Sequence, residues 1–308
     1  MTEMRNAAGL MLSRRSAILG ALALPWTTAS GLAGTITDAG KIPVTVTAPK
    51  RIVTIGSAVT EIVFALGLRS KVVAIDLTSI HVDGAEGLTN VGYMRALSTE
   101  GVLAQAPDLM CVSSDSGPPA VLEALRASGI PFALIPHDPT VDGVKTKVTL
   151  LGALLDRAAE AETLNAKIAA GFATLAEKIS AVSVRPKVLF VLSLADNRIV
   201  AGGTETAANL MIELAGGENI AAAFEGYKPI SVEAVLASPP DAIVMMHDGG
   251  PGSHGVGDVF AHAAFANSPA ARNEALIKMS SAYLLGLGPR TADAATELAR
   301  KLHPELKL

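Results

Sequence analysis

Residues 90–98 (NVGYMRALS) place a tyrosine and an arginine two positions apart, just before a predicted helix. The chain has only three tyrosines, so Tyr93, set beside Gly92 and Arg95, is a rare side chain in such a loop. A phenolate oxygen is a hard anionic ligand for ferric iron, and tyrosine ligates haem iron in some proteins. Free tyrosine titrates near about 10, so a phenolate ligand needs a cation nearby, and Arg95 can supply that charge. The alternative is a surface tyrosine that stacks on its neighbour.

Catalytic motifs are missing from the sequence. It has no GxSxG nucleophile elbow, no HExxH and no phosphate loop, and GGPGSHG at residues 249–255 lacks the Lys-Ser/Thr ending of a phosphate loop. We therefore expect a protein that is not an enzyme. The remote alternative is an exported hydrolase that uses Ser253 or Ser193 with His247 or His254 and an aspartate.

Predicted strands and helices alternate at short spacing on both sides of one long helical segment. In the first part the strands are expected at 50–57, 71–76, 108–113 and 131–136, and the helices at 60–67, 98–105 and 118–128. In the second part the strands are expected at 187–193, 241–246 and 275–279, and the helices at 206–215, 231–237 and 291–302. This alternation predicts an α/β fold of two Rossmann-like lobes.

The two parts also match each other in sequence. Residues 97–114 (LSTEGVLAQAPDLMCVSS) align without a gap on residues 230–247 (ISVEAVLASPPDAIVMMH). One further gap places Gly226-Tyr227 on the first tyrosine motif, so Tyr227 and Lys228 are candidates to contact a ligand, with packing roles as the alternative. Related lobes that face each other leave a ligand cleft between their strand ends.

The segment between the lobes predicts one very long helix over residues 138–186. Apolar side chains recur there at steps of three or four, and about 40 residues at 1.5 Å each would give a rod of about 60 Å. The alternative is two helices broken near Gly152 or Gly171. The predicted division is an export signal at 1–33, a first lobe at 34–140, the interlobe helix at 141–182 and a second lobe at 183–308.

The first 33 residues have the layout of a secretory signal. Ser13-Arg14-Arg15-Ser16 precedes an apolar run at 17–24, and small residues follow. The paired arginines resemble a twin-arginine signal, although ordinary secretory signals also carry such pairs. No cysteine lies near the cleavage region, which excludes a lipoprotein anchor, and the single Cys111 is expected to be buried in a strand. These features predict a soluble periplasmic protein.

The bulk composition excludes two classes of partner. Outside the N-terminus no apolar run reaches about 18 residues, so no membrane-spanning helix is predicted. Lysine and arginine are scattered and the net charge is −4, which argues against nucleic acid. We expect a monomer.

Four stretches together resemble the haemin-binding periplasmic proteins of bacterial haem ABC importers. They are NVGYMRALSTEGVLAQAPDL, TAANLMIELAGGENI, GYKPIS and YLLGLGPRT, within a resemblance that spans about residues 48 to 303. The resemblance implies haem as the transported ligand, Tyr93 as its axial iron ligand, and Arg95 as a charge partner or propionate contact. It also implies docking on a permease with its ATPase. Cobalamin and ferric-siderophore binding proteins share the two-lobed layout and remain the alternative.

The second lobe departs from this family. Several members present an arginine after the strand that corresponds to 241–246, whereas this chain reads Met246-His247-Asp248-Gly249-Gly250. Neutral imidazole ligates haem iron well, so His247 is a candidate for the opposite axial position, with a solvated loop histidine as the alternative. His254 is a weaker candidate. The remaining histidines show no spacing for a shared metal, and most of them are expected at the surface: His81, His137, His262 and His303.

Docking on the permease would use one exposed acidic residue on each lobe in this family. Glu61 matches the first-lobe position, and Glu205 and Glu213 both flank the corresponding second-lobe helix. A solvated helix glutamate is the alternative for each. Arg290, in the GPRT motif, is expected to fix its loop by hydrogen bonds rather than to touch the ligand.

Overall fold

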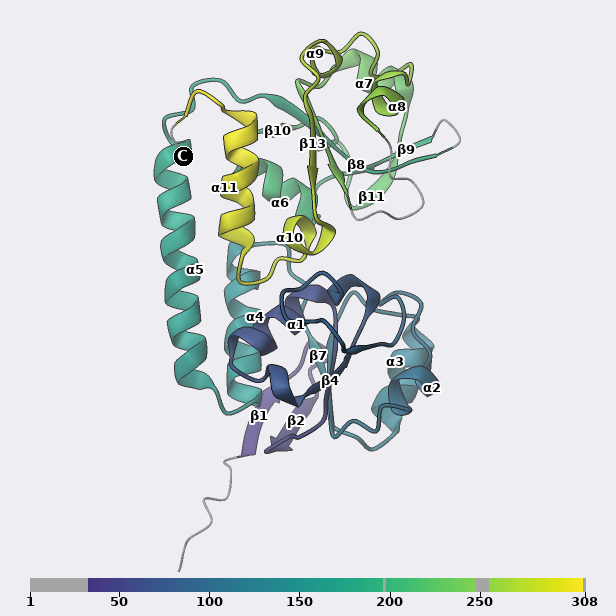
Figure 1. Ribbon diagram of the computed structural model, residues 1–308, viewed down its shortest axis with the longest axis vertical. Coiled ribbons are helices and arrows are strands. Elements are labelled where there is room, and N and C mark those ends of the chain that lie inside the picture. Colours follow the sequence, from purple (N-terminus) through teal and green to yellow (C-terminus); the bar gives the residue numbers. More distant parts are fainter. Residues whose placement is uncertain (1–32, 196–197, 248–254, 307–308) are drawn as a thin grey trace, which may run out of the picture. The chain divides into compact units, whose positions relative to one another are not determined.

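Two β-sheets, each flanked by helices, organise the computed structural model (Figure 1). The structure describes residues 33–195, 198–247 and 255–306. Residues Leu32–Leu308 cluster into one compact unit, and the predicted export signal lies outside the described residues. No helix in the described ranges is long and apolar enough to cross a membrane.

The first lobe is built on a five-stranded parallel sheet with the order β5-β4-β3-β6-β7. Its strands are β3 (Ile52–Ile55), β4 (Val72–Ile75), β5 (Thr89–Asn90), β6 (Leu109–Ser113) and β7 (Phe132–Ile135). Its helical segments are α1 (Ser57–Ala65), η1 (Arg69–Lys71), η2 (Leu77–Ser79), α2 (Thr99–Leu103) and α3 (Pro119–Ala127). All side chains of β3 and β6 are buried, as expected for central parallel strands covered on both faces. Cys111 lies in β6 and is fully buried, as predicted.

The second lobe is built on a mixed sheet with the path β11-β9-β8-β12-β13, and β10 pairs with β8. Its strands are β8 (Lys187–Ala195), β9 (Arg198–Gly202), β10 (Glu218–Asn219), β11 (Tyr227–Ile230), β12 (Ala242–Met246) and β13 (Leu276–Met279). Its helices are α6 (Ala207–Leu214), α7 (Val232–Ala237), α8 (Val256–Phe260), α9 (Pro269–Arg272), α10 (Ser281–Leu285) and α11 (Thr291–Leu302). The alternation did not predict β9, which pairs antiparallel with β8, or β11, which pairs antiparallel with β9.

The repeat seen in the sequence has the same local structure in both lobes. Ser98 caps α2 by accepting the Gly101 N–H, and Ser231 caps α7 by accepting the Ala234 N–H. The aspartate that precedes the next strand also has the same role in each lobe. Asp108 accepts N–H groups at the start of β3, and Asp241 accepts the corresponding N–H at the start of β8. The prediction of two related α/β units is confirmed.

The prediction of one continuous helix over residues 138–186 is wrong in its extent. The chain forms α4 (Val141–Leu154) and α5 (Ala158–Ile179), separated by a turn in which Asp156 has a φ of 55°. The two helices pack side by side, and a Cβ on Gly152 would collide with the side chain of Ala161. Gly152 therefore permits the close contact between the two helices at this turn. The alternative of two helices had placed the break near this residue.

The 22-residue α5 is the element that joins the lobes. Its first half packs against α4, and its second half packs against α11 of the second lobe (Figure 1). A Cβ on Gly171 would lie 3.0 Å from that of Ala292, so this glycine allows α5 and α11 to approach closely rather than breaking the helix. The interlobe helix is thus confirmed in a shorter form.

A two-stranded antiparallel hairpin precedes the first lobe. It consists of β1 (Ala33–Thr37) and β2 (Pro43–Thr47), in which Val44 and Val46 point inward and alternate with exposed residues. The hairpin packs against α4, and Gly34 lies so close to the Leu154 carbonyl that no larger residue fits. This hairpin was not predicted from the sequence.

Candidate functional site

A cavity of about 550 Å³ is lined by residues of both lobes. In the first lobe its lining includes Gly56, which follows β3, and Asp115, which follows β6. These two strands are neighbours at the point where the strand order reverses, which is where open α/β sheets bind ligands. In the second lobe Ser193 of β8 and Met246 at the end of β12 occupy comparable positions. The volume is in the range of small-molecule sites, about 300–1,000 Å³.

The turn from β3 into α1 forms part of the cavity wall. Gly56 has a φ of 98°, and a Cβ there would lie 2.9 Å from the Cβ of Ser113. The Gly56 N–H donates to the fully buried Asp76 carboxylate at 2.8 Å, and the Ser79 hydroxyl donates to the same carboxylate at 2.6 Å. A buried hydrogen-bond network therefore fixes this turn.

Tyr93 and Arg95 both line the cavity, which is the position expected of a pair that binds a ligand. The Arg95 Nη1 donates to the Tyr93 hydroxyl at 3.0 Å, and Nη2 donates to the Asp115 carboxylate at 2.7 Å. Burial opposes the charge of Arg95, but Tyr93 and Asp115 outweigh it and raise the guanidinium pKa above its usual value. Tyr93 is 42% exposed, so its ring and hydroxyl are open to a ligand.

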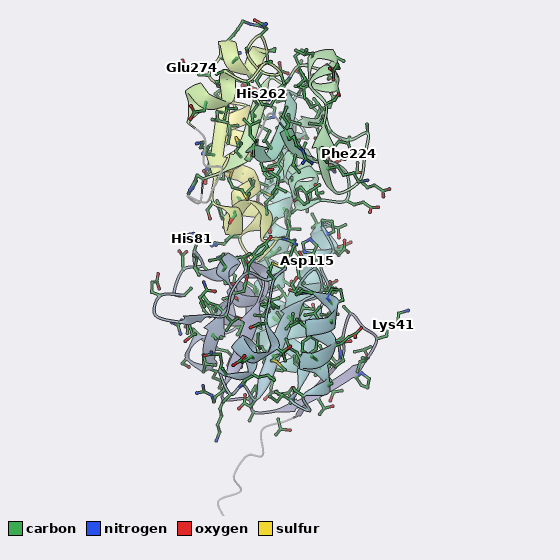
Figure 2. The ribbon with its side chains drawn as sticks, turned by 90° about the vertical axis from the view of Figure 1, so that its right-hand side faces the viewer. Lys41, His81, Asp115, Phe224, His262 and Glu274 are labelled. Atoms are coloured by element: carbon green, nitrogen blue, oxygen red, sulfur yellow. The ribbon has the colours of Figure 1, made fainter. Side chains whose placement is uncertain are left out.

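A histidine and a buried lysine lie behind this pair. His137 follows β7, lines the cavity, and has its Nδ1 3.8 Å from the Asp115 carboxylate. Burial lowers the pKa of His137, and Lys147 and Arg95 lower it further against the attraction of Asp115. Lys147 of α4 is 1% exposed, and burial lowers its pKa to about 8. Figure 2 shows Asp115 and His81 at the edge of the first lobe that faces the second.

The second lobe contributes Tyr227 to the cavity but not Lys228. Both residues belong to β11, where successive side chains point to opposite faces, so one of the two is directed away from the cavity. The Tyr227 ring packs edge-on against Phe190 with ring centroids 6.1 Å apart. Burial raises the pKa of Tyr227, opposed by the Ala208 backbone, the Thr206 side chain and the Arg95 charge.

Apolar side chains cover much of the remaining wall. Leu77 and Ile80 are more than 40% exposed at the first-lobe edge, and Met246 and Leu285 line the second-lobe side. An apolar wall beside a phenol, a guanidinium and an imidazole suits a largely apolar ligand that also carries polar or anionic groups. Among the described residues no group of three or more His, Cys, Asp and Glu side chains could hold a metal ion.

The predicted histidine ligands are placed less favourably than Tyr93. His247 follows β12 directly, its side chain is exposed, and it does not belong to the cavity lining. His254 lies outside the described residues. The expectation that most of the other four histidines lie at the surface is wrong, because His81 alone among them is exposed and His262 is partly buried. His303 is 2% exposed and contacts the Ala215 carbonyl at 3.1 Å, and His137 lies in the cavity wall.

The predicted first-lobe docking residue is engaged within the protein. Glu61 has a side chain only 13% exposed and accepts a hydrogen bond from Nε of Arg290, which also donates to Asp83 at 3.1 Å. Burial raises the pKa of Glu61, and Arg290 opposes that shift. This pair joins α1 of the first lobe to the start of α11 in the second. Docking through Glu61 would therefore have to compete with Arg290.

The second-lobe glutamates are both exposed. Glu205 precedes α6 with a φ of 57°, and Glu213 in α6 accepts a hydrogen bond from the Asn209 amide at 2.9 Å. Arg290 fixes the loop between α10 and α11, as predicted, through its bonds to Glu61 and Asp83.

Two α/β lobes joined by a long helix, with a cavity at their strand ends, are the arrangement of a two-lobed solute-binding protein. Comparison with known proteins agrees with this class. The family model described as "Periplasmic binding protein" matches residues 52–283, and the chain belongs to this family. The prediction that it is a substrate-binding protein and not an enzyme is confirmed.

Three similar proteins illustrate the relationship. The solved apo form of the periplasmic heme-binding protein RhuT from Roseiflexus sp. RS-1 is 34% identical, covers 83% of this chain and 98% of its own, and has a TM-score of 0.79. The uncharacterized ABC transporter substrate-binding lipoprotein YvrC of Bacillus subtilis (strain 168) is 26% identical over 88% of this chain and 86% of its own. The vitamin B12-binding protein of Vibrio campbellii (strain ATCC BAA-1116) is 24% identical over 81% of this chain and 88% of its own.

Asp115 and His137 are cavity residues that were not predicted from the sequence. Both follow the carboxyl ends of parallel strands: Asp115 follows β6, at the position where the strand order reverses, and His137 follows the neighbouring edge strand β7. That position was a usable signal, because the carboxyl ends of such strands carry ligand contacts.

Proposed function

We propose that this protein binds haem in the periplasm and delivers it to an ABC importer in the inner membrane. The observation that carries the proposal is the Tyr93 hydroxyl, which lies at the cavity and accepts a hydrogen bond from Arg95 at 3.0 Å. The guanidinium places positive charge beside a phenol oxygen, a type of oxygen ligand that binds haem iron in some proteins. The similarity to a heme-binding protein at 34% identity and to an ABC transporter lipoprotein supports the same assignment.

In this proposal the first lobe supplies the iron ligand and its counter-charge. Tyr93 coordinates the iron, Arg95 stabilises the phenolate, and Tyr227 contacts the porphyrin from the second lobe. Coordination by His247 from the opposite face stays a prediction, and it requires the exposed imidazole to turn inward. A haem carboxylate contact by Lys228 likewise requires its side chain to reach around β11.

Delivery to the permease is proposed to use acidic residues of both lobes. Glu205 and Glu213 are exposed on the second lobe, where basic residues of a partner can reach them. Glu61 would take part once a partner cation displaces Arg290 from its carboxylate. Charges at such a rim mainly tune association rates and their salt dependence. Export through the N-terminal segment, by a twin-arginine or ordinary secretory route, belongs to the same proposal.

The second candidate is cobalamin, because the vitamin B12-binding protein of Vibrio campbellii also matches most of the chain. Three ligands added separately to the purified protein would separate the candidates: ferric haemin, cyanocobalamin and a ferric hydroxamate siderophore. Haem transport predicts a saturable change in the haemin absorption spectrum and no binding of the other two. Saturable binding of cyanocobalamin without binding of haemin would contradict the proposal.

A further inference from the structure

Asp115 occupies the turn directly after β6, at the cavity, with both carboxylate oxygens engaged. Oδ2 accepts from Nη2 of Arg95 at 2.7 Å, and Oδ1 accepts from the Ser113 hydroxyl at 2.6 Å. The Asp115 side chain is 23% exposed. Two hydrogen bonds to different oxygens fix the plane of this carboxylate, so that it presents a rigid acceptor to Arg95.

Arg95 depends on that acceptor for its orientation. Its side chain is 51% exposed, so the protein surface by itself does not hold it in place. The guanidinium uses Nη2 for Asp115 and Nη1 for the Tyr93 hydroxyl. Because the guanidinium is planar and its donors form a fixed fork, anchoring one nitrogen also directs the other. Loss of the anchor would leave a long side chain free to sample other rotamers.

Further positive charge faces Asp115 from inside the lobe. Lys147 is 1% exposed, and its Nζ has no hydrogen-bond partner in the part of the chain that the structure describes. Asp115 and Asp138 are the carboxylates that interact with it electrostatically. Such a buried ammonium destabilises a fold. Its charge attracts the Asp115 carboxylate, which lies in the cavity lining with Oδ1 3.8 Å from Nδ1 of His137.

We propose that Asp115 is a positioning residue that directs the Arg95 guanidinium onto the phenol oxygen of Tyr93 and so favours porphyrins that carry ferric iron. This inference rests on the proposed function and adds the source of its metal selectivity. In this inference Asp115 is not an iron ligand. It acts through Arg95, whose charge matters only where the phenol oxygen becomes a metal ligand.

The test compares two ligands that differ only in the metal: ferric haemin and iron-free protoporphyrin IX. Asp115→Ala should raise the Kd for haemin by about 10-fold or more, equal to about 1.4 kcal/mol, and change the Kd for protoporphyrin by less than about 2-fold. Asp115→Asn keeps an acceptor oxygen for Arg95 and should stay within about 3-fold of wild type for haemin. Asp138→Ala is the matched control, because Asp138 also interacts with Lys147 but lies outside the cavity lining.

Each outcome decides the inference. Unchanged haemin affinity in Asp115→Ala would overturn it, and so would an equal loss for both porphyrins, which would assign Arg95 to the carboxylates instead. A far-ultraviolet circular dichroism spectrum like that of wild type, with full protoporphyrin binding, shows that the variant is folded. Wild-type protein that binds protoporphyrin and haemin equally would overturn the selectivity, whereas wild-type protein that binds neither would refute the proposed function itself.

Discussion

Replacing Lys147 by methionine tests the electrostatics of the first lobe without touching the cavity. The ammonium is fully buried without a hydrogen-bond partner in the described part of the chain, and burial lowers its pKa from 10.5 to about 8. That difference corresponds to about 3 kcal/mol of folding free energy at neutral pH. Lys147→Met keeps a long unbranched side chain, one atom shorter, and removes the charge. We therefore expect the variant to be more stable than wild type by up to about 3 kcal/mol at pH 7.

The stability difference between Lys147→Met and wild type should depend on pH. Below about pH 8 the lysine is protonated in both the folded and the unfolded chain, so the folded state carries the full penalty of the buried charge. Between about 8 and 10.5 the folded lysine loses its proton while the unfolded one keeps it, so the stability of wild type rises relative to Lys147→Met. The advantage of the variant should therefore shrink as the pH rises through this window.

Urea unfolding of the ligand-free protein at pH 7 and pH 9.5, with linear extrapolation, measures both effects. Lys145→Met is the matched control, because Lys145 lies on the same helix but is 38% exposed and paired with Asp142 at 2.6 Å. A change within about 0.5 kcal/mol is expected there. Equal stability of Lys147→Met and wild type at pH 7, or a gain that is the same at both pH values, would refute the reasoning.

Three further substitutions test other contacts. Arg290→Ala leaves the largely buried Glu61 carboxylate without its cation and should lower the unfolding free energy by about 2 kcal/mol. The loss should be larger at pH 8 than at pH 5, and adding Glu61→Gln should recover part of it. An unchanged denaturation midpoint would contradict this prediction. Asp241→Ala removes the acceptor for the Lys187 N–H and should cost about 1 kcal/mol in urea unfolding, so no loss would argue against the repeat's structural role. Gly56→Ala places a Cβ 2.9 Å from Ser113 at a φ of 98° and should cost on the order of 2 kcal/mol; a wild-type melting temperature would refute it.

Local patterns in the sequence were enough to predict the order of most strands and helices. The duplicated motif located the helices capped by Ser98 and Ser231, and the strands that follow them, because each unit contains its own cap and turn. The break between α4 and α5 was not fixed by periodicity, since the apolar stripe continues across it. It depends on the contact of Gly152 with Ala161, which forms only when the two helices fold against each other.

The candidate site shows the same limit. Tyr93 and Arg95 are two residues apart, and their hydrogen bond lies within one loop, so sequence reasoning could pair them. The partner Asp115 is 20 residues away from Arg95, and backbone hydrogen bonds of Gly117 with Met94 and Leu97 join the two loops. His137 lies close to the same carboxylate because β7, which it follows, pairs with β6. Contacts of this kind depend on the order of the strands within the sheet, which was not predicted from the sequence.

The central claim is that the phenol oxygen of Tyr93 ligates the iron of a bound haem. The most direct measurement is a titration of wild type and Tyr93→Phe with ferric haemin, followed by the optical spectrum and the Kd. The phenylalanine keeps the ring at the cavity and removes only the oxygen that Arg95 contacts. We predict a Kd at least about 10-fold higher, equal to about 1.4 kcal/mol, together with a changed ferric spectrum. A Tyr93→Phe protein with the affinity and spectrum of wild type would contradict the account.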